Sequence, residues 1–292
     1  MDFYQINDLE RLSGVKAHTI RIWEKRFGLI TPHRTETNIR YYDDTQLKKI
    51  LNVATLSAVG FKISKIAAMS EQELRIQIKE SQQHELSDSR FDFYVNDFIG
   101  AMLDFNEQYF NELFAEVVEK FGVQSAMINI LYPFLFKTGV LWRVDEAIPV
   151  QEHFASMLIR RNLFLLIGNL PTPKNKSKKF LLFLPSNEWH EIGLLFAEYI
   201  IRYHGLETIN LGQHVPYVDL EHVIVKAKPD FLLTFLISDT HEEYINHLHN
   251  LLSTKYKKTQ CLISGNPAKL DIYSESKNLK ILRFPKDILK VL

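Results

Sequence analysis

The chain has 292 residues, and its 35 basic and 35 acidic side chains give a formal net charge of zero. At roughly 100–200 residues per domain, this length predicts two or three domains. Hydrophobic residues make up 46% and charged residues 24%, a balance typical of globular proteins that excludes general disorder. No run of about 18 apolar residues occurs, so the sequence predicts no membrane-spanning helix.

Cysteine content and the first residues indicate the compartment. The single cysteine, Cys261, excludes an internal disulfide and a zinc site built from cysteines. The start Met1-Asp2-Phe3-Tyr4-Gln5 lacks the basic and apolar regions of a secretory signal. We therefore expect a cytoplasmic protein.

The charges are unevenly distributed along the chain. Residues 1–75 hold 12 basic and 9 acidic residues, net +3, and residues 76–170 hold 7 and 13, net −6. Residues 171–292 hold 16 and 13, net +3. A basic beginning followed by an acidic middle predicts that the first part of the chain meets a polyanion.

The first seventy-five residues have a helix-turn-helix pattern. Apolar residues at helical spacing end at Gly14, and a second short helix is expected from His18 to Phe27. A turn-rich segment then leads to Ile39–Tyr42, which suits the strand of a small hairpin wing. Third and fourth helices are expected from Asp43 to Val59 and from Ser64.

The second helix and the wing are rich in hydrogen-bond donors. A recognition helix needs such side chains to reach base edges, and a wing needs them to contact phosphates. An ordinary solvated helix face is the alternative explanation. The candidate DNA-binding residues are Thr19, Arg21, Trp23, Lys25, Arg26, His33, Arg34, Arg40 and Tyr41.

The run from Thr19 to Thr35, with Ile39-Arg40-Tyr41-Tyr42 and Gly60-Phe61, resembles the winged-helix domain of MerR-type regulators. Its R-x-W-E-x-R-F-G form is similar to the branch of light- and vitamin B12-linked repressors that contains CarH, CarA and LitR. The resemblance implies Arg21, Arg34 and Arg40 as DNA contacts. It implies that Trp23 and Tyr41 either pack the wing or touch the DNA backbone. Asn38 stands where the family usually has Gly, and because Asn tolerates a positive φ, we expect the wing turn to form.

Residues 87–169 are helical in pattern and predict a four-helix bundle. Within it, Trp142 precedes Glu152 and His153 in a W-x9-E-H spacing. A core Trp with two exposed polar residues is the simple explanation. The same regulators carry this motif, and the resemblance implies that these three residues cap the upper face of cobalamin. Light-sensing members have His after that Trp, whereas Arg143 here offers no lone pair to a metal, which argues against light-driven capture of cobalt at this position.

A polar linker is expected at 171–179, before alternating strands and helices. Strands are predicted at 180–184, 208–211, 231–236, 260–263 and 280–283, with helices between them. This order predicts a doubly wound, flavodoxin-like (Rossmann-like) parallel sheet with ligands at the carboxyl ends of its strands. The domains are therefore expected at 1–75, 76–170 and 180–292.

Glu188-x-His190-x-x-Gly193 follows the first of these strands. A surface histidine in a loop is the simple explanation, but the segment resembles the D-x-H-x-x-G motif of cobalamin-binding modules. In that motif the His is the lower cobalt ligand, the carboxylate orients its ring, and the Gly allows close approach of the nucleotide tail. The resemblance extends to Gly212, Thr234, Leu236, Ser264 and Gly265, where Ser264 replaces a family Gly and crowds the tail.

Three functions follow from these patterns. The first is a transcriptional regulator, expected to be a repressor, that binds a DNA operator as a homo-oligomer (dimer or tetramer) and senses cobalamin, with adenosylcobalamin suspected. The second is a regulator whose ligand-free B12-like domain serves oligomerisation. The third is a corrinoid carrier in methyl transfer, but the sequence contains no domain that would activate a substrate. We therefore expect no enzyme activity.

Overall fold

The structure is a computed structural model. It describes residues 4–58, 60–70, 73–74, 77, 89–142, 149–173, 178–239, 241–283 and 285–292. The chain forms two compact units, Met1–Leu158 and Ile159–Leu292. Among the described residues, no helix is both long enough and apolar enough to cross a membrane.

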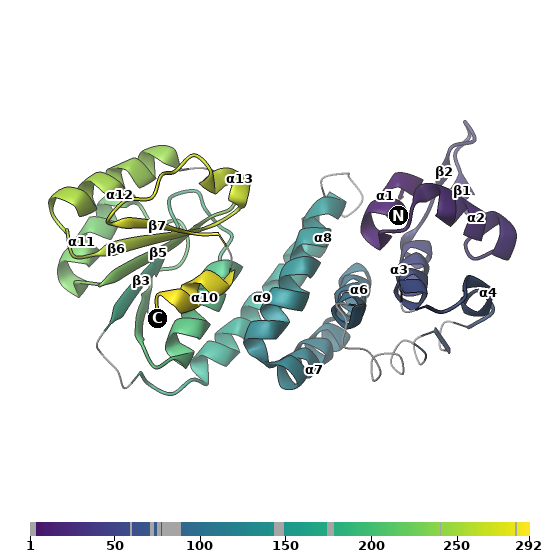
Figure 1. The fold of residues 1–292 in the computed structure, drawn as a ribbon, viewed down its shortest axis with the longest axis horizontal. Helices are drawn as coiled ribbons and strands as arrows, with labels where there is room; N and C mark the ends of the chain where they lie inside the picture. The colour runs from purple at the N-terminus through teal and green to yellow at the C-terminus, as the bar shows by residue number, and fades with distance from the viewer. Residues whose placement is uncertain are drawn as a thin grey trace. The chain divides into compact units, whose positions relative to one another are not determined.

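The first unit begins with a winged helix-turn-helix (Figure 1). Helices α1 (Ile6–Ser13) and α2 (Ala17–Phe27) end at Gly14 and Gly28, both with positive φ, as glycine C-caps commonly do. Strands β1 (His33–Arg34) and β2 (Arg40–Tyr41) form the antiparallel wing. Asn38 in its turn has φ 65°, as predicted.

Two further helices complete this domain: α3 (Asp44–Ala58) and α4 (Ile63–Ile66). Val59, where the third helix was expected to end, lies outside the described residues. Leu9, Ile20, Trp23 and Leu47 are buried, so the apolar sides of α1, α2 and α3 form its core.

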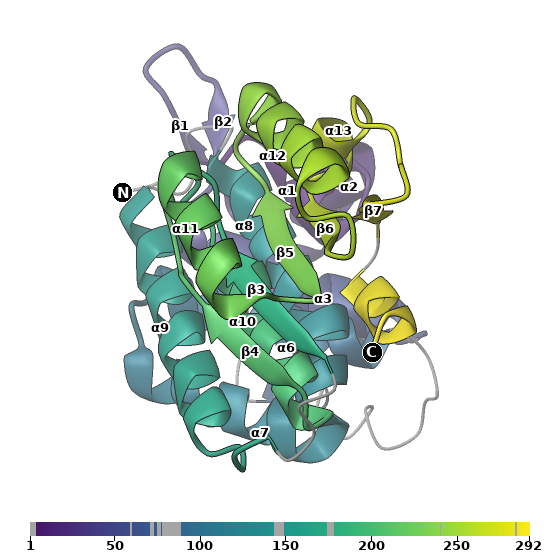
Figure 2. The ribbon, with the colours of Figure 1, turned by 90° about the vertical axis from the view of Figure 1, so that its left-hand side faces the viewer.

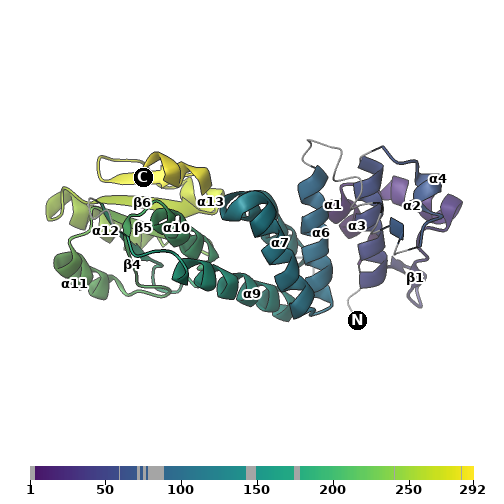
Figure 3. The ribbon, with the colours of Figure 1, turned by 90° about the horizontal axis from the view of Figure 1, so that it is seen from below.

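The rest of the first unit is helical, as the sequence predicts. It contains α6 (Ser89–Leu103), α7 (Glu107–Ala126), the π-helical segment Met127–Leu131, α8 (Tyr132–Trp142) and the first half of α9 (Pro149–Gly168), whose second half belongs to the second unit. Asn106 caps α7 by accepting a hydrogen bond from Tyr109 N at 3.0 Å, and Gly122 (φ 75°, ψ 156°) interrupts it. The rings of Phe98, Phe110 and Phe134 pack together in the core. Figure 3 shows α6 beside α3.

The second unit contains one parallel sheet. Its strands are β3 (Lys179–Phe183), β4 (Glu207–Asn210), β5 (Phe231–Leu236), β6 (Gln260–Gly265) and β7 (Leu279–Leu282). Their order is β4-β3-β5-β6-β7 (Figure 2), the flavodoxin-like order that the sequence predicts. β3 begins at Lys179, the last residue of the expected linker.

Helices cover both faces of this sheet: α10 (Ile192–Tyr203), α11 (Tyr217–Ala227), α12 (Glu242–Thr254), α13 (Pro267–Leu270) and the 3-10 helix Pro285–Lys290. α11 and α12 share an apolar core with Phe183, Leu232 and Ile263, while α10 lies on the opposite face (Figure 1). Burial in this core raises the pKa of the Cys261 thiol to about 12. The strand order reverses between β3 and β5, and ligands of such sheets bind at that reversal.

Candidate functional site

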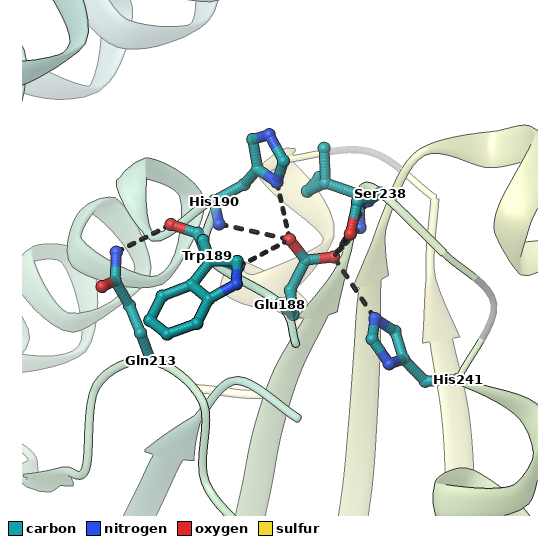
Figure 4. Close-up of polar contacts among 7 residues, drawn as sticks. Glu188, Trp189, His190, Gln213, Ser238 and His241 are labelled. Carbon is teal, nitrogen blue, oxygen red and sulfur yellow. Dashed lines mark hydrogen bonds and ion pairs between the residues drawn. The ribbon is translucent and has the colours of Figure 1, made fainter. Parts of the chain in front are cut away.

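Glu188 lies in the loop after β3, and its side chain is completely buried (Figure 4). One carboxylate oxygen accepts hydrogen bonds from Trp189 N, at 3.0 Å, and His190 N, at 3.2 Å. The other accepts from Ile237 N at 2.8 Å and from Ser238 N and Oγ at 2.9 and 3.0 Å. Two loops of the sheet therefore converge on one carboxylate.

These donors keep Glu188 ionised. Burial raises the pKa of Glu188, but the hydrogen bonds from the His190 ring and from the backbone of Ser238, Ile237 and His190 outweigh burial. The pKa is therefore held well below its ordinary value. Hydrogen bonds donated to a carboxylate stabilise its ionised form, so even a buried carboxylate can have a lowered pKa.

His190 completes the pair. Its Nδ1 lies 2.6 Å from Glu188 Oε1, and its side chain is 56% exposed. Contact with an ionised carboxylate favours the tautomer with hydrogen on Nδ1, which puts the imidazole lone pair on Nε2. The residues present therefore suit the lower-ligand role that the resemblance of this segment to cobalamin-binding modules implies. Sequence reasoning named both members of this pair.

Ser238 and His241 were missed by sequence reasoning. Ser238 donates its hydroxyl to Glu188, and His241 Nε2 lies 3.5 Å from the same carboxylate oxygen (Figure 4). Both come just after β5, the strand that pairs with β3. A polar residue at the carboxyl end of an adjacent parallel strand was the available signal.

The backbone around this loop is unusual. Asn187, His214 and His241 all have positive φ, a conformation that non-glycine residues rarely adopt. His214 stacks on Trp189 with ring centroids 4.9 Å apart and accepts a hydrogen bond from Asn187 N at 2.8 Å. Gln213 donates to the Trp189 carbonyl at 2.7 Å. Such strain is typical of ligand sites.

The structure separates the other predicted cofactor residues onto two faces of the sheet. Thr234 is in register with Phe183 and Ile263, on the side of α11 and α12. Adjacent strand residues point to opposite faces, so Phe235 points toward α10. A Cβ added at Gly193 of α10 would lie 2.9 Å from two atoms of the Phe235 ring. Gly193 and Thr234 are therefore not brought together.

The remaining candidates have structural partners. Leu236 is buried in the core beside α11 and α12. Ser264 donates its hydroxyl to Leu282 O at 2.9 Å. A Cβ on Gly265 would lie 2.1 Å from Leu236 O, so close strand packing alone requires this glycine. Gly212, at φ 74°, accepts a hydrogen bond from Leu184 N after β4.

Glu152 and His153 lie side by side on α9, in the first unit. His153 Nδ1 is 3.2 Å from Glu152 Oε2, and the His153 side chain is 74% exposed. Trp142 ends α8, but its side chain and Arg143 lie outside the described residues. Their assignment to a cofactor cap remains a prediction.

α2 presents an exposed face that carries basic side chains. His18, Arg21, Ile22 and Lys25 are all exposed and follow one another at i, i+3, i+4 and i+7. Arg26 is also exposed and Thr19 is half-buried. Trp23 is only 7% exposed, so it belongs to the domain core and is not a candidate for base contact.

The wing residues are held by neighbours. Arg34 donates to Asn38 Oδ1 at 2.6 Å, and Arg40 Nε contacts Glu24 Oε1 at 3.2 Å. His33 Nε2 lies 2.9 Å from Asp43 Oδ2, and its ring stacks on Tyr41. The Arg40 and His33 contacts tie the wing to α2 and to the residue directly before α3.

Two protein families match separate parts of the chain. The family described as MerR HTH family regulatory protein matches residues 4–73. The family described as B12 binding domain matches residues 94–166, which lie in the helices α6 to α9.

Curated relatives match most of the chain. The HTH-type transcriptional repressor CarH of Myxococcus xanthus is 28% identical over 252 residues, which cover 85% of this chain and 84% of the relative. CarA, an HTH-type transcriptional repressor of the same organism, is also 28% identical over 252 residues, with 85% and 82% covered.

A solved structure supports the fold. The monomethylamine corrinoid protein of Methanosarcina barkeri superimposes with a TM-score of 0.55 at 16% identity. The match covers 69% of this chain and 95% of the other.

Proposed function

We propose that this chain, which combines a MerR-type helix-turn-helix domain with a B12 binding domain, is a DNA-binding transcriptional regulator controlled by cobalamin. The observation that carries the proposal is the Glu188–His190 pair, an oriented imidazole at the reversal of a parallel sheet. The same chain carries helix α2, whose exposed face has basic side chains that suit DNA.

At the DNA end, Arg21 and Lys25 are proposed to contact DNA from the face of α2. Arg34 is proposed to contact phosphates from the wing, and Asn38 holds it in place. Arg40 would serve chiefly to fix the wing, because its guanidinium is paired with Glu24. We propose binding as a homodimer or tetramer, with paired half-sites in the operator.

At the cofactor end, His190 would hold cobalt from below and Glu188 would orient its ring. Glu152, His153 and Trp142 are proposed to face an upper ligand. Bound cobalamin would supply a cobalt ion with an exchangeable upper ligand, and we propose the adenosyl form. Such a regulator acts in the cytoplasm and is not an enzyme.

The test is an absorbance spectrum. Purified protein is mixed with adenosylcobalamin in the dark, desalted and scanned, with His190→Ala beside it. The wild-type protein is expected to retain cobalamin absorbance after desalting, with the spectrum of the form whose tail base is displaced. The His190→Ala variant is expected to lose that absorbance. His222→Ala is the matched control, because that exposed histidine lies on α11. A colourless wild-type protein contradicts the proposal and favours a ligand-free oligomerisation domain.

Binding to DNA is measured separately. An operator selected from random duplexes is titrated with apo and cobalamin-treated protein, in the dark and after illumination. A change in affinity of about tenfold, or about 1.4 kcal/mol, between the two forms is expected. Equal affinity in every condition contradicts cofactor control while leaving the DNA-binding function in place.

A further inference from the structure

Gly193 has a close aromatic neighbour. Gly193 lies in the first turn of α10, three residues after His190. An added Cβ would approach Cδ1 and Cε1 of Phe235 to 2.9 Å, closer than real Cβ atoms come to their neighbours. The phenyl ring therefore rests against the glycine backbone and fills the space that the absent side chain leaves.

The surroundings of Phe235 hold the ring there. Phe235 is partly buried and is in register with Ser264 on β6, so both point to the face of α10. The Ser264 hydroxyl is bonded to Leu282 O of β7, and the residue is 9% exposed. Two side chains thus occupy the sheet face opposite the start of α10.

The hydroxyls on this face already have partners, since Ser264 donates to Leu282 O at 2.9 Å and Thr208 donates to Glu198 at 3.4 Å. Thr234 Oγ1 is buried and has no hydrogen-bond partner among the described residues, but it points to the side of α11 and α12. The metal-ligand pair, by contrast, is complete, and His190 is more than half exposed. The site fits a metal ligand at one end and does not fit a nucleotide base at the other.

We propose that the Phe235 ring occupies the space beside Gly193 that a nucleotide tail would need. The site would then bind corrinoids through the metal and the ring and accept forms without a nucleotide base. This inference rests on the proposed cofactor function. It identifies the ligand class as corrinoids with or without a base, and Phe235 as the residue that sets this tolerance.

Binding titrations with two probes test the proposal. Dicyanocobinamide, which has no nucleotide base, is compared with cyanocobalamin on the full chain. Wild-type dissociation constants within about threefold of each other are expected, because the base gains no contact. Phe235→Ala frees the space beside Gly193 and is expected to tighten cobalamin binding about tenfold, with cobinamide binding unchanged.

Two controls accompany the titrations. Tyr203→Ala removes an exposed ring at the far end of α10 and should change neither constant. Phe235→Leu retains apolar volume and should give an intermediate gain. The inference is overturned if the wild-type protein binds cyanocobalamin more than about tenfold more tightly than dicyanocobinamide and Phe235→Ala does not tighten cobalamin binding. That result leaves the proposed cofactor function in place.

The packing is also tested without cofactor. Gly193→Ala should lower the free energy of unfolding by about 1–3 kcal/mol in the wild-type chain, because the new methyl group meets the ring. In the Phe235→Ala variant, Gly193→Ala should lower the free energy of unfolding only slightly. An equal loss of stability in the wild-type chain and in Phe235→Ala overturns the inference. If neither probe binds either protein, the proposed cofactor function fails and this inference fails with it.

Discussion

Arg160 of α9 forms an ion pair with Glu191, the residue directly after His190. The Glu191 side chain is only 8% exposed, and Arg160 is 36% exposed. Glu191 is also the residue from which α10 starts. The ion pair therefore anchors the loop of the proposed metal ligand to Arg160, which lies in the second unit.

Reversing the charge at position 160 should loosen this loop. Arg160→Glu is expected to lower the free energy of unfolding by about 1–3 kcal/mol, because Glu191 is left buried beside a like charge. Urea unfolding measures the loss, and Arg161→Glu, on the exposed neighbouring residue, is the control. The double variant Arg160→Glu/Glu191→Arg should recover most of the stability. Additive losses in the double variant contradict a direct pairing.

Glu188 makes the stability of the second unit depend on pH. Its pKa in the folded protein is lower than the ordinary value of 4.5, so its ionised form stabilises the fold fully at neutral pH. That contribution declines as the pH falls below about 4.5 toward the lower folded value. Glu188→Gln should cost roughly 1.5–3 kcal/mol at pH 7, because charge-assisted hydrogen bonds are lost.

Urea unfolding at several pH values tests this expectation. The difference between wild type and Glu188→Gln should shrink steadily as the pH falls below 4.5. A difference that stays constant down to strongly acidic pH would assign the loss to packing and not to the carboxylate charge. Glu221→Gln changes a partly exposed carboxylate on α11 that pairs with Lys255, and it should have little effect on stability at any pH.

Arg21 is expected to act on DNA without supporting the fold. Its side chain lies in the middle of the exposed face of α2. Arg21→Ala should weaken operator binding by about 1–3 kcal/mol if it reads a base, with thermal stability unchanged. Lys255→Ala removes an equal charge from the second unit and should leave DNA binding intact. An unchanged footprint for Arg21→Ala would contradict the assigned DNA-binding face.

Trp23, in contrast to Arg21, is expected to support the fold and not to contact DNA. It is 7% exposed in the core of the helix-turn-helix, so Trp23→Ala is expected to cost about 3–5 kcal/mol of stability. Trp23→Phe should retain most of that stability and bind the operator normally. If Trp23→Phe folds as the wild type does but loses operator binding, the indole makes a DNA contact after all.

Local sequence patterns were sufficient for the elements. Gly14 and Gly28 mark the helix ends because a positive φ at those positions is cheapest for glycine, and Asn38 shows the same conformation in the wing. The five strands follow from short apolar runs and lie within two residues of their expected bounds. The Glu188–His190 pair was also predictable, because two residues of one loop determine its geometry.

Contacts between distant segments were decided by tertiary structure. Ser238 and His241 reach Glu188 only because β5 pairs with β3, which brings residues at least fifty positions away along the chain to one carboxylate. Strand register places Thr234 and Phe235 on opposite faces, a result that motif spacing does not encode. The sequence by itself determined the element order and the proposed metal ligand. Tertiary packing decided that Phe235 rests against Gly193. Protein interiors are closely packed, so a neighbouring side chain fills the space that a glycine leaves empty.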